Sequence, residues 1–163
     1  MAEIEVKIED NTNQVREQLS KAIEQVLFAW GTEGVAGCVE KASEIDEETG
    51  RPTVDTGRYR AGFGFVTPTK GKMSGTPAQE KGLNDDFSGQ RASKDTVVIA
   101  NNVEYAPYLE FGTGTKEGGR HARYIMKRGI ESKIPQMKKD MEQILKGEKV
   151  SMSVGGITGG NYE

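Results

Sequence analysis

The stretch from Thr96 to Gly114 constrains the fold of this chain more than any other. It opens with an apolar run, Val97–Ala100, which is typical of a buried strand, and Asn101-Asn102 stops that strand. The densest cluster of aromatic and apolar residues follows, from Tyr105 to Phe111, and two glycines end it. We predict that this stretch forms a rigid corner, in which a strand ends at two asparagines and a short aromatic turn ends at two glycines. The rest of the chain is expected to pack against this corner.

The corner and its surroundings carry no pattern typical of catalysis. The glycine-rich run after Phe111 lacks a closing Gly-Lys-Ser/Thr, and Glu117 stands where a dinucleotide fingerprint requires its third glycine. One histidine, His121, and one cysteine, Cys38, are too few for a four-ligand zinc site within one chain. Apolar neighbours predict that Cys38 is a small buried residue. We therefore expect no catalytic residue, no cofactor and no bound metal.

Periodicity predicts the first two elements. Residues 3–9 alternate between charged and apolar side chains, which predicts a strand with Ile4, Val6 and Ile8 on one face. An apolar stripe at helical spacing then predicts one long helix from about Asn13 to Glu48. Three glycines near its middle favour a bend or the close approach of another backbone.

The second half of the chain is predicted to alternate between ordered elements and long connections. A strand over 61–66 has Phe63 and Phe65 on one face, and a polar segment, 67–95, is expected to form a long mobile loop between antiparallel strands. A last helix begins at about Ala122, and Pro135 predicts that it kinks or divides into two abutting helices.

These elements predict an α+β fold, in which a small, mainly antiparallel sheet packs against a long N-terminal helix and a C-terminal helix. The 163 residues, with 34% hydrophobic content and 21 glycines, indicate a modest core with long loops. We expect a single domain over 1–146 and a Gly/Ser-rich flexible tail over 147–163.

The net charge of −3 gives no overall attraction to nucleic acid or to an anionic membrane. Acidic residues gather at 40–48 and basic residues along the last helix, from Lys127 to Lys146. They are either two solvated helix faces or the complementary ends of neighbouring subunits. No apolar run of membrane length is present, so we expect a chain made and kept in a cytoplasm-like compartment, without a membrane partner.

Two alternatives stay open from the residues alone. Asp55-Thr56-Gly57 matches the triplet of aspartic proteases, which would require a homodimer, although Arg58 follows where a small residue is favoured. The other interpretation of the triplet is an aspartate that caps a turn. The basic C-terminal helix suggests a nucleic-acid-binding module, but aromatic residues for base stacking are not interleaved with its charges.

Several of these segments together resemble the head–tail joining proteins of tailed bacteriophages, also called neck, tail-completion or minor tail-component proteins. The resemblance rests on Val54–Arg60, on a strand ending in Asn101, on Tyr105–Thr113 and on Ala122–Ile125. It covers the chain from Ile4 to about Leu145. The pairing of the Asp-Thr-Gly-Arg element with the Tyr-Ala to Glu-Phe-Gly-Thr element is its most specific part.

The resemblance implies a structural virion protein without catalytic activity, made in the bacterial host cytoplasm. It implies a homo-oligomeric ring, six-fold in the virion, between the portal–connector complex with its head-completion proteins and the tail tube or tail terminator protein. DNA would pass through the lumen without sequence recognition. Glu110 and Asp55 are expected to make structural hydrogen bonds or an ion pair with Arg58 or Arg123. The residues assigned to assembly and structure are Asp55, Thr56, Gly57, Arg58, Tyr105, Tyr108, Glu110, Phe111, Gly112, Thr113 and Arg123.

Overall fold

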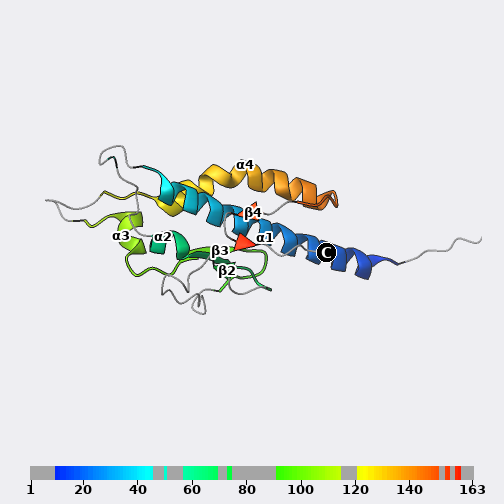
Figure 1. Ribbon diagram of the computed structural model, residues 1–163. Helices are drawn as coiled ribbons and strands as arrows, with labels where there is room; N and C mark the ends of the chain where they lie inside the picture. The colour runs from blue at the N-terminus through cyan, green and yellow to red at the C-terminus, as the bar shows by residue number, and fades with distance from the viewer. Residues whose placement is uncertain are drawn as a thin grey trace, which may run out of the picture.

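The computed structural model describes residues 10–45, 50, 57–69, 73–74, 91–114, 121–150, 153–154 and 157–158. Nine helices and strands lie in these ranges (Figure 1). In chain order they are α1 (Thr12–Ser43), α2 (Gly57–Ala61), β1 (Phe63–Val66), β2 (Met73–Ser74), β3 (Val98–Asn101), α3 (Ala106–Phe111), α4 (Ile125–Leu145), β4 (Ser153–Val154) and β5 (Ile157–Thr158).

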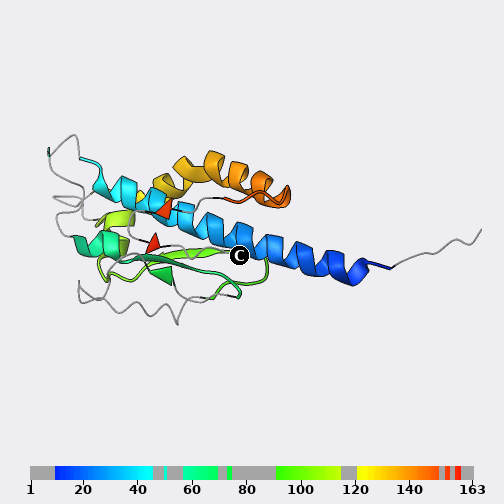
Figure 2. The ribbon, with the colours of Figure 1, turned by 45° about the vertical axis from the view of Figure 1, so that its right-hand side comes forward.

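The sheet is small and antiparallel, as predicted. Its order is β2-β1-β3, and the register of the central pair runs from Phe63 opposite Asn101 to Val66 opposite Val98. The long helix α1 lies between this sheet and α4 (Figures 1 and 2). The predicted α+β fold, with a sheet packed against an N-terminal and a C-terminal helix, is therefore confirmed.

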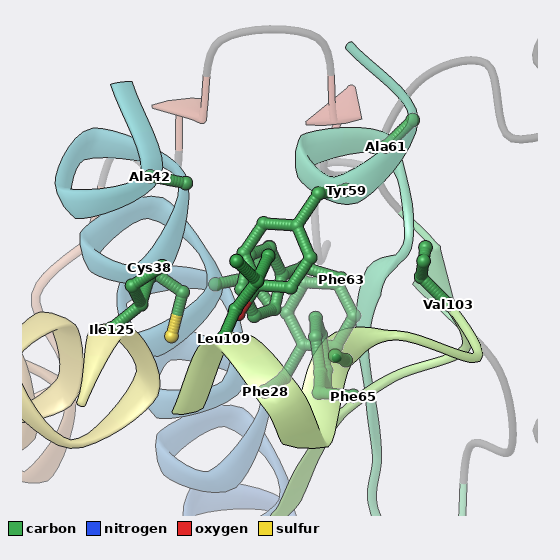
Figure 3. Close-up of a cluster of buried hydrophobic side chains, with 12 residues drawn as sticks. Phe28, Cys38, Ala42, Tyr59, Ala61, Phe63, Phe65, Val103, Leu109 and Ile125 are labelled. Carbon is green, nitrogen blue, oxygen red and sulfur yellow. The ribbon is translucent and has the colours of Figure 1, made fainter. Parts of the chain in front are cut away.

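The core lies where α1 crosses the sheet. Phe63 and Phe65 of β1 are fully buried, on one face of the strand. The ring of Phe65 meets that of Phe28 edge-on at 5.3 Å, and Tyr59 meets Phe63 edge-on at 5.0 Å (Figure 3). A Cβ on Gly31 would lie 2.2 Å from the Phe65 ring, so the glycine lets that ring pack directly on the backbone of α1.

The predicted close approach of a second backbone is found where α1 crosses α4. A Cβ on Gly37 would lie 2.2 Å from the carbonyl oxygen of Gly129, and a Cβ on Gly129 would lie 2.6 Å from the backbone nitrogen of Cys38. Two glycines thus face each other across the contact and bring the helix axes unusually close. Cys38 itself is fully buried beside this contact, as expected.

Both long helices are shorter than predicted. α1 ends at Ser43 rather than at Glu48, because Glu44 adopts an extended conformation (φ −62°, ψ 144°). Its carboxylate there binds Lys41 and Arg128. α4 begins at Ile125 rather than at Ala122, because the residue before it, Tyr124, has left-handed backbone angles (φ 48°, ψ 44°).

Pro135 lies inside a single helix, so the predicted division into two abutting helices is wrong. The part of α4 that follows Pro135 is held against α1. The Trp30 indole N–H of α1 donates a hydrogen bond to the Met137 carbonyl at 2.9 Å, and Met137 and Ile144 are buried. Tertiary packing therefore outweighs the hydrogen bond that proline removes.

Two short helices, α2 and α3, were not predicted as helices. The sequence predicted a turn where α3 lies, and a lead-in to a strand where α2 lies. Helices of five and six residues are too short to show a helical period and are stabilised by their contacts rather than by propensity.

Several predicted segments lie outside the described residues. These are the strand over 3–9, residues 46–49, Asp55 and Thr56, and most of the loop over 67–95 and of the tail over 147–163. Within the loop range, β2 pairs with β1, and within the tail range, β4 pairs with β5.

Candidate assembly surface

The corner predicted from Thr96 to Gly114 is built on one buried carboxylate. Glu110, on α3, is only 7% exposed. Its two oxygens each accept a hydrogen bond from the backbone N–H of Met126 at 3.0 Å, and one also accepts from Lys127 at 3.2 Å. The first N–H groups of a helix have no partner within the helix and form the positive end of its dipole. Glu110 therefore caps α4 from a separate helix.

The main chain strengthens the same junction. The N–H of Arg123 donates to the Leu109 carbonyl at 3.1 Å, and that of Tyr124 donates to the Glu110 carbonyl at 3.2 Å. Gly112, which ends α3, has a φ of 76°, a left-handed angle that favours glycine. The chain can thus leave α3 and return to start α4 beside it.

A second junction brings α2 to the corner. The side-chain amide of Asn101 donates to the Tyr59 carbonyl at 2.9 Å, and its oxygen accepts from the Val103 N–H at 2.9 Å. The rings of Tyr59 and Tyr105 stack at 6.3 Å. The Gly57-Arg58 element and the Tyr105–Thr113 element, paired in the sequence analysis, are therefore neighbours through Tyr59 and Asn101.

The structure divides the predicted assembly residues into buried and exposed ones. Glu110 is buried and Tyr105 half-buried, with their contacts inside the subunit. Gly57, Gly112, Thr113 and Arg123 are half-buried, and Arg58 is exposed. Asp55 and Thr56 lie outside the described residues. Sequence reasoning did not assign Tyr59 and Asn101 to the site, although Tyr59 lies within the Val54–Arg60 motif and Asn101 ends the strand on which the resemblance rests.

Three aromatic side chains face solvent at this corner. Tyr108 is 59% exposed and Phe111 72% exposed, both on α3, and Tyr124 is 47% exposed at the start of α4. We call these three residues the aromatic patch. Tyr124 was not among the predicted site residues, because its place beside α3 depends on the Glu110 cap. Large apolar side chains gathered on the surface are typical of contact sites.

The buried polar groups behind the patch do not resemble an acid–base site. Burial raises the pKa of the Cys38 thiol to about 12, and the negative charge of Glu110 adds to the effect. Burial, and then Glu110, also raise the pKa of Tyr59, whose hydroxyl has no hydrogen-bond partner within the described part of the chain. Both groups stay protonated at neutral pH, so neither is an activated nucleophile.

The charged ends of the two long helices meet within one subunit. Lys133 of α4 pairs with Glu40 of α1 at 2.6 Å, and Arg128 pairs with Glu44 at 2.8 Å. These four residues therefore pair within the subunit, and the contact between an acidic end and a neighbour's basic end stays a prediction for the other charges. Other basic residues on or beside α4 are exposed, among them Lys127, Lys138, Lys139 and Lys146.

Within the described ranges of the chain, no helix combines the length and the apolar character that a membrane span requires. In the same ranges, no three metal-ligating side chains of histidine, cysteine, aspartate or glutamate gather in one place.

Comparison with known protein families gives a match over most of the described N-terminal part. Residues 7–112 match the model of the HK97-gp10-like family, described as "Bacteriophage HK97-gp10, putative tail-component". This range includes α1, the whole three-stranded sheet and α3. Neither the curated proteins nor the solved structures contain a match.

Proposed function

Because this chain belongs to the HK97-gp10-like family of bacteriophage tail components, we propose that it is a non-enzymatic neck or tail-completion protein of the virion. It acts at the head–tail interface, where it assembles as a ring that joins the portal–connector to the tail tube. Its partners are further copies of itself, the head-completion proteins on one side, and the tail tube or terminator protein on the other.

The family match is the observation that carries this proposal, and the corner supports it. The one deeply buried carboxylate of the corner holds a helix end. The large apolar side chains turned outward there are the aromatic rings of Tyr108, Phe111 and Tyr124. A site of this kind binds another protein surface and offers no group for bond making.

The two alternatives gain no support from the geometry. In the nucleic-acid-binding alternative, the basic helix α4 would offer its charges to phosphates, but Arg128 and Lys133 are paired with glutamates of α1. In the protease alternative, the catalytic carboxylate is Asp55, which lies outside the described residues. Gly57 and Arg58, which follow it, open the short helix α2.

The proposal is tested with phage that carry a stop codon in this gene. We expect lysates with DNA-filled heads and complete tails that are not joined, counted by electron microscopy. Adding the purified chain should restore joined, infectious particles, and Lys139→Ala, on the exposed face of α4, should restore them equally well. Joined particles without the protein, or a defect in the tails alone, would contradict a place at the neck.

A further inference from the structure

The first turns of α1 have no covering element in their own subunit. Val15 and Leu19, one turn apart, are 59% and 53% exposed. They continue the apolar stripe of Ala22 and Val26, which packs against Ile144 of α4. α1 extends beyond both the sheet and the end of α4 (Figures 1 and 2). An apolar stripe that continues past its own core is typical of a surface covered by another chain.

The nine residues before this end of α1 lie outside the described part, and their sequence has the period of a strand. Residues 3–9, which we call the arm, place Ile4, Val6 and Ile8 on one face and charged residues on the other. Such a segment forms a stable strand only when it joins a sheet that covers its apolar face.

The short chain between the arm and α1 limits how far along its own subunit the arm can reach. β3 crosses α1 at Gly34, where a Cβ would lie 2.2 Å from the Ile99 side chain. Along the helix axis, Gly34 is about 33 Å from Thr12, at about 1.5 Å per residue. A fully extended chain carries Ile8 at most about 14 Å from Thr12 and Ile4 at most about 29 Å. The arm therefore ends short of Ile99 even when it is stretched.

The sheet has an edge that suits an added strand. β3 is the outer strand, and the N–H of Asn102 donates to the Gly62 carbonyl at 3.0 Å. Since hydrogen bonds alternate along an antiparallel pair, the backbone groups of Val98 and Ala100 face β1 and those of Ile99 face outward. Within the described residues, nothing hydrogen-bonds to these outward groups of Ile99. The stretch from Thr96 to Asn102 has neither a charged residue nor a proline, the usual devices that block an edge.

We propose that the arm of one copy adds as a strand to the free edge of β3 in a second copy. The apolar face of the arm then extends the face of the sheet that packs on α1, and Val15 and Leu19 are covered at the same contact. Each copy donates one arm and accepts another, so the contact is heterologous and can close into a ring. The inference rests on the proposed function, because it names the contact that would hold that ring together.

The first test removes the arm. A chain without residues 2–9 is compared with the full chain by sedimentation equilibrium, and its fold is checked by circular dichroism. We expect the full chain to assemble and the shortened chain to be monomeric, with the helix content of a folded chain and a cooperative unfolding transition. A synthetic peptide of residues 1–11 should bind the shortened chain, with a Kd below about 1 mM, and should lose at least about tenfold in affinity when Ile4, Val6 and Ile8 are serine.

The second test places a crosslink between copies and does not require a shortened chain. Ala100 lies on the face of β3 turned away from α1, because Ile99 faces α1. Charged arm residues would share that face, so Ala100→Cys is combined with Glu5→Cys or with Lys7→Cys. Oxidation should give covalent dimers and larger species. Each single substitution, and Lys7→Cys with Lys139→Cys, should give only background dimer. The native Cys38 is buried and does not interfere.

The outcomes separate this inference from the proposed function. A shortened chain that still forms the oligomer of the full chain would overturn the arm contact, but it would not contradict the proposed ring. A monomeric full chain with no peptide binding, or no crosslink in either double variant, also overturns it. Arm-dependent assembly in a protein that does not restore head–tail joining would support the contact and contradict the proposed place in the virion.

Discussion

At the scale of single residues, the corner depends on Glu110. This carboxylate is buried, carries a charge, and is satisfied by backbone N–H groups of a helix that begins 15 positions later in the chain. Sequence reasoning assigned it to a structural hydrogen bond or an ion pair, and the structure shows hydrogen bonds to the end of α4. Hydrogen bonds from helix N–H groups to a charged acceptor are among the stronger hydrogen bonds in proteins.

Replacing Glu110 with alanine should lower the free energy of unfolding by about 3 kcal/mol, because the N–H groups of Met126 and Lys127 lose a charged acceptor away from water. The midpoint of urea denaturation measures the loss. Glu104→Ala is the matched control, since Glu104 is exposed on the same corner, and it should change the free energy by less than about 0.5 kcal/mol. Equal values for the two variants would mean that the cap contributes no stability.

At the scale of elements, the contact between α1 and α4 depends on two glycines. Alanine normally stabilises a helix relative to glycine by about 1 kcal/mol. At Gly37 the added Cβ would meet the backbone carbonyl of Gly129 at 2.2 Å, and a backbone atom cannot move aside cheaply. We therefore expect Gly37→Ala to destabilise the protein by about 3 kcal/mol, the reverse of its intrinsic effect.

Thermal or urea unfolding of Gly37→Ala measures this cost. The control is Gly114→Ala, which has no atom within 4 Å of its added Cβ and should be near neutral. A Gly37→Ala variant as stable as the parent would show that the two helices can separate at this point without loss, contrary to close packing.

The same pair of helices encloses a carboxylate whose charge is unfavourable. Burial raises the pKa of Glu33 on α1, Asp140 on α4 raises it further, Lys133 lowers it, and Glu40 raises it slightly. Asp140 is itself buried and accepts a hydrogen bond from Gln136 at 2.7 Å. A carboxylate with a raised pKa in the folded state costs stability above that pKa, and costs nothing below its ordinary value, where it is protonated in both states.

Glu33→Gln should therefore stabilise the protein at pH 8, which raises its melting temperature. The gain in the free energy of unfolding should be up to about 1 kcal/mol, because the group is only partly buried. The difference should disappear as the pH falls below the ordinary range of glutamate. Melting curves of both proteins from pH 3.5 to pH 8 measure it. A difference that grows toward low pH would mean that the ionised form of Glu33 is stabilised instead.

At the scale of the whole molecule, two groups of exposed apolar residues lie far apart. The aromatic patch lies at the corner of α3 and α4, while Val15 and Leu19 lie on the end of α1 that projects away from it (Figure 1). Two different surfaces on one subunit are what a closed ring of identical copies, or a protein held between two neighbours, requires.

Phe111→Ala should leave the stability of the chain within about 0.5 kcal/mol of the parent, because the side chain is largely exposed. It should nevertheless reduce the recovery of joined particles when added to lysates that lack the protein, since an exposed aromatic anchor is lost from the contact. Lys138→Ala, another exposed residue far along α4, is the control for this complementation assay. If Phe111→Ala restores joining as well as the parent does, the aromatic patch is not part of the assembly surface.

Local pattern alone determined much of the fold. The helical period of α1, the strand that stops at Asn101 and the shared face of Phe63 and Phe65 all depend on neighbours in the chain. Spacing along the chain encodes such features directly, so the sequence could predict them.

Only the tertiary structure decided which distant groups meet. The cap that Glu110 provides for α4 joins two segments separated by a loop. The ion pairs of Arg128 with Glu44 and of Lys133 with Glu40 join residues 84 and 93 positions apart. The exposure of Tyr124 depends on the same packing. A charge run or an aromatic cluster looks the same in sequence whether its members are satisfied inside the subunit or left for a neighbour. Whether such residues find partners inside the subunit depends on how the folded helices cross. The periodicity of the sequence does not specify that crossing.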